Sequence, residues 1–305
     1  MHWGYIVLAF AGVALMRVAQ KICGKTVSNI AEGKESFRYG GYYQLLSTLV
    51  SLITLAVVGF HGFNWQTVLC GLGTAFFLAV ELFTGIEALK GCSLIVAQMF
   101  SVGALFIPCI FGIFLFGEPM SALQWIGLVV FLISMYFMAA PAQQNKQEAP
   151  KKMSLKTWVN LIVGMLASGG TMVVQKVFSV LVPGGNTAMY SFLMFGFSTL
   201  VLYATYLVLA MLQNKGAKQA VKRQPMRKEL LVCGAILAVA VFVINMLVTE
   251  LGKTVESAIL FSVSYAISII ITILVGALYY KEKVNWKNVV GIFLCVGSLA
   301  IITFC

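Results

Sequence analysis

The sequence predicts an all-α integral membrane protein in which ten transmembrane helices form two inverted five-helix repeats. Of its 305 residues, 60% are hydrophobic and 10% are charged, whereas a soluble domain has about 45–50% apolar and about 25% charged residues. Ten apolar runs have about the 20 residues that a helix needs to cross a bilayer. Four short motifs recur in the same order in the two halves. Together these observations indicate a duplicated membrane bundle.

Each apolar run is expected to form a helix, because continuous apolar runs lack the period-two alternation of barrel strands. The first run has neither a positive n-region nor a small-residue cleavage site, so we expect a membrane span and not a cleaved signal peptide. Most connections between runs are very short. The predicted helices span residues 3–23, 40–60, 66–89, 93–116, 122–140, 157–181, 186–212, 228–251, 255–280 and 286–304.

The distribution of basic residues predicts the orientation. The chain carries 21 Lys and Arg residues against 10 acidic residues, for a net charge of +11. Arg17 lies inside the first run, Lys176 and Lys253 lie on the even-loop side, and the other 18 share the side of the odd-numbered loops. Because cytoplasmic loops are enriched in Lys and Arg, we expect a multi-pass plasma-membrane protein with both termini outside. The charges flank membrane spans and form no basic face on a folded domain, so nucleic-acid binding is not expected.

The two halves of the chain share motifs in the same order. The matched pairs are MRVAQK (16–21) with MVVQK (172–176), LCG (69–71) with VCG (232–234), EALK (87–90) with ELGK (250–253), and FGEPMSALQWIG (116–127) with YKEKVNWKNVVG (280–291). Each half holds five runs, an odd number, so the second copy enters the membrane from the opposite side and the repeat is inverted. We expect a first repeat at 1–140, a cytoplasmic linker at 141–156 and a second repeat at 157–305.

This pattern resembles the drug/metabolite transporter superfamily, and in particular its EamA-type members. The segments FGEPMSALQWIGLVVFLIS (116–134) and YKEKVNWKNVVGIFLCVGS (280–298) carry most of the likeness, which extends over nearly the whole chain. The resemblance implies a secondary active transporter that moves small polar or amphipathic metabolites, amino-acid-like or similar, by alternating access with proton coupling. It also implies a central substrate cavity lined by helices 1, 3, 4, 6, 8 and 9.

Two alternatives stay open at this level. An exporter of cationic drugs or toxic metabolites would have the same architecture, and a membrane-embedded enzyme is the more remote alternative. Such an enzyme often uses His or Asp as acid and base, and this chain has two His and no Asp. No GxxxxGK[ST] motif is present, so coupling has to come from a gradient. No metal or cofactor is expected, since the seven Cys form no CxxC pair. A monomer or a homodimer fits equally well.

Glu81 and Arg17 are the first candidates for site residues. Glu81 interrupts the apolar stretch FFLAVELFTG of the third predicted helix, and Arg17 lies within the first. Both lie about 9–12 Å from the predicted cytoplasmic helix ends at about 1.5 Å per residue, so the two side chains can meet. Ionisable residues inside a membrane span are functional candidates by default. Arg17 is expected to bind a carboxylate or phosphate, and Glu81 an ammonium or the coupling proton. The alternatives are a structural Arg17–Glu81 pair, or an Arg17 that extends to the interface.

Further polar residues lie on the helices expected to form the cavity. Gln20 and Gln175 recur at matched positions of the repeat, where they can bind substrate or link helices through hydrogen bonds. Lys21 and Lys176, which follow them, are expected to anchor helix ends at the membrane interface. The remaining substrate-binding candidates are Gln98, Asn245, Ser264 and Tyr265.

Two repeated charge pairs and one small-residue segment complete the set. The pairs Glu87–Lys90 and Glu250–Lys253 have the same i,i+3 spacing in both halves. We interpret them as solvated helix ends, with a gating role as the alternative. The segment SGGT (168–171) is expected to allow close helix approach or bending.

Overall fold

The computed structural model describes residues 3–30, 34–61, 64–117, 120–138, 153–182, 184–216, 227–281 and 286–304, and the regular elements of these residues are all helical. The helices are α1 (Trp3–Ile30), α2 (Lys34–Val58), α3 (Trp65–Gly91), α4 (Leu94–Gly103), α5 (Phe106–Phe116), α6 (Ala122–Met138), α7 (Leu155–Leu181), α8 (Thr187–Gly216), α9 (Lys228–Gly252), α10 (Ser257–Leu274), the π-helical turn η1 (Val275–Tyr279) and α11 (Trp286–Phe304).

Seven segments of the described residues are long and apolar enough to cross a membrane. They are Ser36–Val58, Trp65–Gly91, Val96–Phe116, Leu155–Leu181, Thr187–Leu212, Lys228–Gly252 and Ile259–Tyr279. Shorter apolar helices lie at Ala122–Ser134 and Val289–Ile302. Every predicted run therefore falls on helical structure, but several helix ends differ from the prediction. The largest difference that bears on the site is in α1, which continues to Ile30 instead of ending at residue 23.

The fourth predicted helix is divided into α4 and α5. Pro108 has no N–H group to donate to the carbonyl of Ala104, and the Ile107 N–H bonds to that carbonyl instead, at 3.1 Å. The N–H groups of Ala104 and Leu105 likewise bond three residues back. These tighter turns interrupt the α-helical pattern just before the proline.

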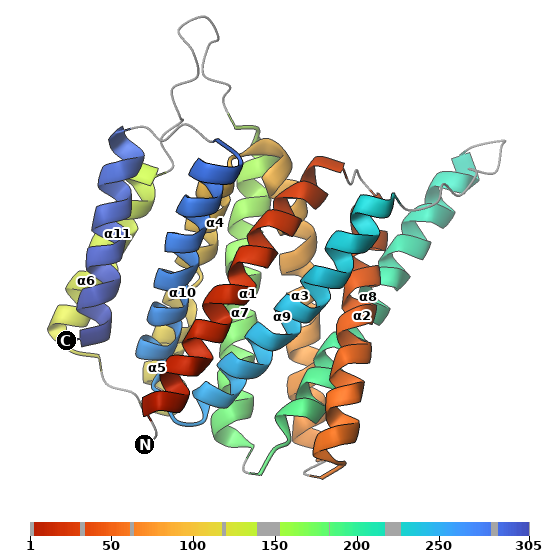
Figure 1. Ribbon diagram of the computed structural model, residues 1–305, viewed down its shortest axis with the longest axis horizontal. Coiled ribbons are helices and arrows are strands. Elements are labelled where there is room, and N and C mark those ends of the chain that lie inside the picture. Colours follow the sequence, from red (N-terminus) through yellow and green to blue (C-terminus); the bar gives the residue numbers. More distant parts are fainter. Residues whose placement is uncertain are drawn as a thin grey trace, which may run out of the picture.

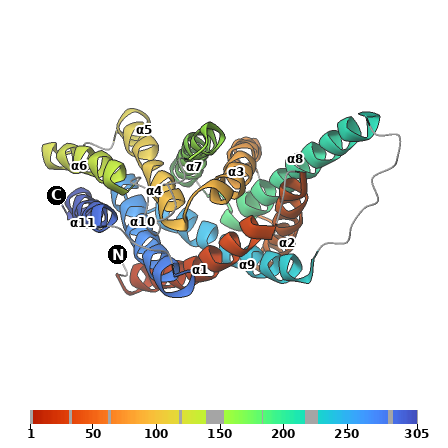
Figure 2. The same ribbon diagram turned by 90° about the horizontal axis from the view of Figure 1, so that it is seen from above.

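The helices form a bundle with a broad centre and two paired edges. Figures 1 and 2 show α6 beside α11 at one edge and α2 beside α8 at the other. The helices α1, α3, α4, α7, α9 and α10 lie between these edges. In Figure 1, α1 begins and α11 ends at the same end of the bundle. We call the opposite end, where α1 and α3 end and α7 and α9 begin, the linker end.

A buried carboxylate joins three helices at the linker end. Glu87 of α3 accepts hydrogen bonds from Lys90, from Lys156 at 2.9 Å and from Ser36 of α2 at 3.3 Å. Its side chain is only 6% exposed. The interpretation of the Glu87–Lys90 pair as a solvated helix end is therefore wrong. The contact with Lys156 forms because α7 begins beside α3, and residue spacing within α3 cannot reveal that neighbour.

The matched pair in the second half is different. Glu250 and Lys253 form an ion pair of 2.9 Å with side chains 32% and 35% exposed, as expected for a solvated helix end.

Candidate functional site

A cavity of about 290 Å³ lies between the central helices. Its wall comes from α1, α3, α4, α7, α9 and α10, together with two tyrosines of α2. In α1 the lining residues run from Arg17 to Val27, and in α3 from Leu78 to Leu89. Both stretches belong to the parts of these helices nearer the linker end, so the cavity lies toward that end.

All the residues predicted for the site line this one cavity. They are Arg17, Gln20, Glu81, Gln98, Gln175, Asn245, Ser264 and Tyr265. The reason is physical, since a polar side chain on a membrane helix is costly against lipid and faces the interior of the bundle or a cavity. All of them border the cavity, but their contacts differ from one residue to the next.

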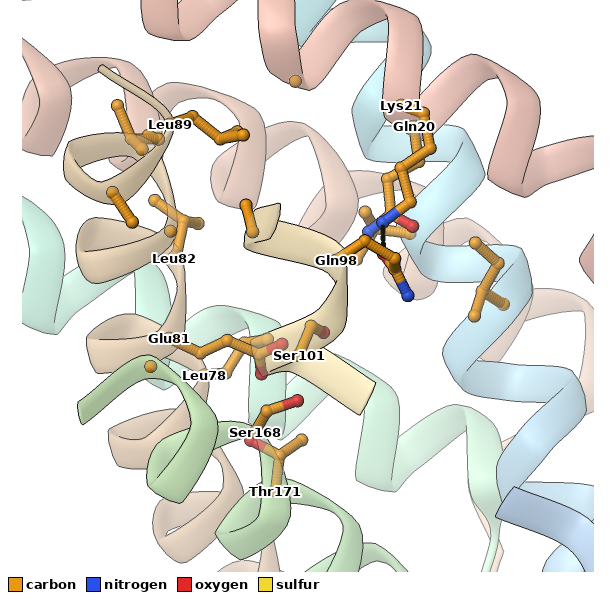
Figure 3. Close-up of a pocket in the computed structure, with 18 of the residues that line it drawn as sticks. Gln20, Lys21, Leu78, Glu81, Leu82, Leu89, Gln98, Ser101, Ser168 and Thr171 are labelled. Atoms are coloured by element: carbon orange, nitrogen blue, oxygen red, sulfur yellow. Dashed lines mark hydrogen bonds between the residues drawn. The ribbon is translucent and has the colours of Figure 1, made fainter. Parts of the chain in front are cut away.

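Glu81 extends from α3 toward the hydroxyl groups of two other helices. Figure 3 shows its carboxylate near Ser101 of α4 and near Ser168 and Thr171 of α7. The Ser168 and Thr171 side chains are three residues apart, so they share one face of α7 and both hydroxyl groups lie on the side of Glu81. Thr171 Oγ1 donates to the Ala167 carbonyl of its own helix at 3.2 Å, and Ser168 Oγ pairs with Tyr265 Oη at 3.5 Å.

Two glycines allow α7 to come close to its neighbours beside these hydroxyls. A Cβ atom on Gly169 would lie 2.7 Å from the Ile107 Cβ of α5. A Cβ atom on Gly170 would lie 2.7 Å from Cδ1 of Phe77 in α3. Real Cβ atoms do not approach other atoms so closely. The close approach expected of the segment 168–171 is therefore present.

The opposite wall is cationic. Arg17 and Lys21 are four residues apart and lie on one face of α1. Arg17 Nη1 donates to Gln20 Oε1 at 2.7 Å. Lys21 Nζ donates to Gln98 Oε1 across the cavity (Figure 3). Among the described residues no direct ion pair joins Arg17 to Glu81, and the two interact at longer range.

Neither lysine of the matched QK motifs acts as an interfacial anchor. Lys21 lies in the cavity wall, where it bonds to Gln98, and α1 continues nine residues beyond it. Lys176 is 4% exposed and donates to the carbonyl of Val255 at 2.8 Å, in the turn between α9 and α10.

The amide side chains of α7 and α9 differ in their partners. Gln175 Nε2 of α7 donates to the Asn245 carbonyl at 3.0 Å and to Thr249 Oγ1 at 2.6 Å, both in α9. Asn245 Nδ2 donates to the Val241 carbonyl of its own helix at 2.9 Å. This is the interhelical alternative that the sequence left open for Gln175, although its side chain still borders the cavity.

Several lining residues were missed from the sequence. Tyr265 Oη lies 3.5 Å from Ser168 Oγ and donates to Met172 Sδ at 3.7 Å, and both partners belong to α7. Helix α7 therefore contributes more residues to the site than Gln175 alone. A polar or small residue recurs along α7 every three or four positions, at Asn160, Gly164, Ser168, Thr171 and Gln175, and all five line the cavity. This helical period marks one face of α7 and is the signal that could have found them.

Within the described residues, no three His, Cys, Asp or Glu side chains lie together as a metal site would require.

Comparison with known proteins agrees with this architecture. No curated protein matches the sequence. One solved crystal structure aligns with 97% of this chain and 95% of its own at a TM-score of 0.64, with 16% identity, so the likeness is one of fold alone. The model of the EamA-like transporter family matches residues 156–304, from the first turn of α7 to the end of α11. This match covers the second half of the chain, and the EamA-like transporter family is part of the drug/metabolite transporter superfamily.

Proposed function

We propose that this protein is a secondary active transporter that carries small polar or amphipathic metabolites through the central cavity by alternating access. The observation that carries the proposal is a cavity of about 290 Å³ inside the bundle whose lining includes the ionisable residues Arg17, Lys21 and Glu81. A fold that needed only stability would avoid such groups, since intramembrane charges are costly and mark functional sites. The family match supports the same conclusion.

The proposed architecture is ten spans in two inverted repeats, at 1–140 and 157–305, joined by the linker at 141–156. The packing of the helices supports it. In two such repeats α1 is equivalent to α7, α2 to α8 and α3 to α9. The contact between α1 and α9 then has the contact between α7 and α3 as its equivalent. In the same way, the contact between α2 and α9 has the contact between α8 and α3 as its equivalent. All of these pairs pack together, and α2–α8 is its own counterpart. Such an equivalence is expected when two similar halves are related by an axis in the membrane plane.

A lysine in each half makes a similar contact, although Lys25 lies one turn after Lys21, which is the matched counterpart of Lys176. Lys25 of α1 donates to the carbonyls of Leu89 and Cys92 at 3.1 and 3.2 Å, where α3 turns into α4. Lys176 of α7 donates to the Val255 carbonyl, where α9 turns into α10. In each half, a lysine of the first helix thus stabilises the turn after the third. Both matched glutamines border the cavity, although they bond to different partners.

For orientation we propose that the linker end faces the cytoplasm and that both termini face outside, in the plasma membrane. The excess of Lys and Arg in the connections at that end supports this. The cavity then lies on the cytoplasmic side of the bundle.

Glu81 is the proposed coupling group. Its carboxylate borders the cavity, where a proton and a substrate can both reach it. It lies within electrostatic range of Arg17 and Lys21, so its charge and the occupancy of the cationic wall are coupled. If Glu81 takes up a proton when substrate leaves and releases it when substrate binds, the movement of protons across the membrane is linked to the movement of substrate.

The test uses purified protein in liposomes that contain a pH-sensitive dye. Candidate compounds are first screened by thermal shift, since a ligand of the folded state raises its apparent stability. With a compound that binds, the wild type is expected to move protons when the compound is added, and to accumulate it under an imposed pH gradient. Glu81→Gln is expected to lose both effects while it keeps exchange of the compound.

The matched control is Glu250→Gln, which removes an exposed carboxylate outside the cavity and is expected to behave as the wild type. If Glu81→Gln accumulates the compound as the wild type does, Glu81 is a structural residue and the proposed coupling is wrong. If no compound that binds is ever moved across the liposome membrane, the transport proposal itself fails.

A further inference from the structure

Building on the proposed transport function, we infer that the cavity selects small organic anions, with a carboxylate or phosphate group held against the α1 wall. The charges of the lining residues give the first argument. Among the described lining residues, Arg17 and Lys21 are the cations beside Glu81, which alone is acidic, whereas Lys25 is engaged with the carbonyls of Leu89 and Cys92. A ligand with net negative charge reduces this imbalance, whereas a cation would increase it.

The hydrogen-bonding groups give a second and independent argument. Within the described part of the chain, Arg17 Nε and Asn160 Nδ2 are buried donors that have no protein partner. Ser264 Oγ is a third unpartnered group, on a side chain that is 5% exposed. Glu81 is the one carboxylate among the described lining residues, and it lies beside the Ser168 hydroxyl. What the wall offers a ligand is therefore mainly donors, which suit the acceptor oxygens of a carboxylate or phosphate.

The position of the donors orients the anion. Arg17 lies one turn from Lys21 on the same face of α1, and Lys21 reaches across to Gln98 of α4. An anionic group between these side chains would contact both cations. It would leave the rest of the ligand facing the apolar surface of Leu78, Phe100 and Phe261.

The size of the cavity limits the ligand. Pockets for drug-sized molecules occupy roughly 300–1,000 Å³, and this one, at about 290 Å³, lies at the small end. Charge and size together argue against a large cationic drug and favour a short-chain organic anion.

The experiment measures binding of a four-carbon series to the full-length protein in nanodiscs. Succinate, succinamate, succinamide and putrescine have similar length and run from two negative charges to two positive charges. Glycerol 3-phosphate and glycerol form the phosphate arm. The anions are expected to bind at least about tenfold more tightly than the neutral members, and putrescine is expected not to bind. The better of succinate and glycerol 3-phosphate identifies the anionic group.

Variants test the cause of this selectivity. Arg17→Gln and Lys21→Gln are each expected to weaken anion binding roughly tenfold to hundredfold, the usual effect of losing a charged hydrogen bond. Lys253→Gln is the matched control, because Lys253 lies outside the cavity and is expected to leave binding unchanged. If Arg17→Gln does not fold, Lys21→Glu provides the second test, since it should move the preference from succinate toward putrescine.

The inference is overturned if succinamide or putrescine binds as tightly as succinate, if neither anion binds, or if the folded variants bind anions as the wild type does. These outcomes differ from a failure of the proposed function. Anions that bind but never cross a liposome membrane would refute transport alone. Saturable uptake of putrescine would refute anion selectivity alone.

Discussion

Gly169→Ala should loosen the contact between α5 and α7 beside the candidate site. A Cβ atom at position 169 would lie 2.7 Å from the Cβ of Ile107 and 2.9 Å from its Cγ1. The Ile107 Cβ is attached to the backbone, so no side-chain rotation relieves the clash. The two helices have to separate by several tenths of an ångström.

The expected cost follows from two opposing terms. Overpacking a well-packed interior costs typically about 1–3 kcal/mol. Replacing glycine by alanine inside a helix returns roughly 0.5–1 kcal/mol. The net change is a loss of about 0–2.5 kcal/mol in the free energy of unfolding. Because Ser168 directly precedes Gly169, the same separation should move its hydroxyl relative to Glu81 and lower transport.

The assay is reversible unfolding in mixed micelles, with Gly297→Ala as the matched control. Gly297 is also inside a helix, but its Cβ would meet nothing within 4 Å, so this variant should be neutral or slightly more stable. Adding Ile107→Gly, which removes the clashing Cβ of residue 107, should recover part of the loss, with a coupling energy of about 0.5–3 kcal/mol. The reasoning is refuted if Gly169→Ala is as stable as Gly297→Ala, or if the double variant is simply additive.

Three further predictions concern stability and topology. Glu87→Gln should lower the free energy of unfolding by about 1–3 kcal/mol, since it breaks hydrogen bonds to a charged and buried group. Lys156→Gln should lower the free energy of unfolding by at most about 1 kcal/mol, because the lysine side chain is 74% exposed. Denaturant titrations that give Glu87→Gln and Lys156→Gln the same loss of stability would contradict this reasoning. Gln175→Leu should cost about 0.5–2 kcal/mol by removing two bonds to α9, and an unchanged unfolding midpoint would show that these bonds contribute nothing. A reporter that is active only in the cytoplasm should work within 141–156 and fail at the C-terminus, and activity at the C-terminus would reverse the proposed orientation.

The positions of the helices were predictable, because the bilayer demands about 20 apolar residues for each crossing. The ends of the helices were not, since hydropathy records where apolar residues stop and a helix can continue into polar sequence. α1 ends at Ile30 for this reason, well after the apolar run is over. The break at Pro108 was visible as a proline in the sequence, but its effect depends on how neighbouring carbonyls are satisfied.

The sequence indicated which polar residues line the cavity better than it indicated which residues they contact. Isolated polar residues in apolar runs have to face the interior, which is why Glu81 and Gln98 both line the cavity. The partners of each side chain depend on which helices are neighbours in space. No spacing within α3 indicates that Glu81 meets Ser168 and Thr171 of α7, or that Glu87 meets Lys156.

The position of Lys21 decides which kind of ligand the cavity suits. With Lys21 at the membrane edge, as the sequence predicted, the cavity would contain Arg17 against Glu81, a balanced pair that suits a zwitterion such as an amino acid. In the structure Lys21 instead lies in the cavity wall and bonds to Gln98. The balance moves to net positive charge, so the best-matched ligand changes from a zwitterion to an anion. The succinate-to-putrescine series therefore tests the position of Lys21 together with the selectivity that follows from it.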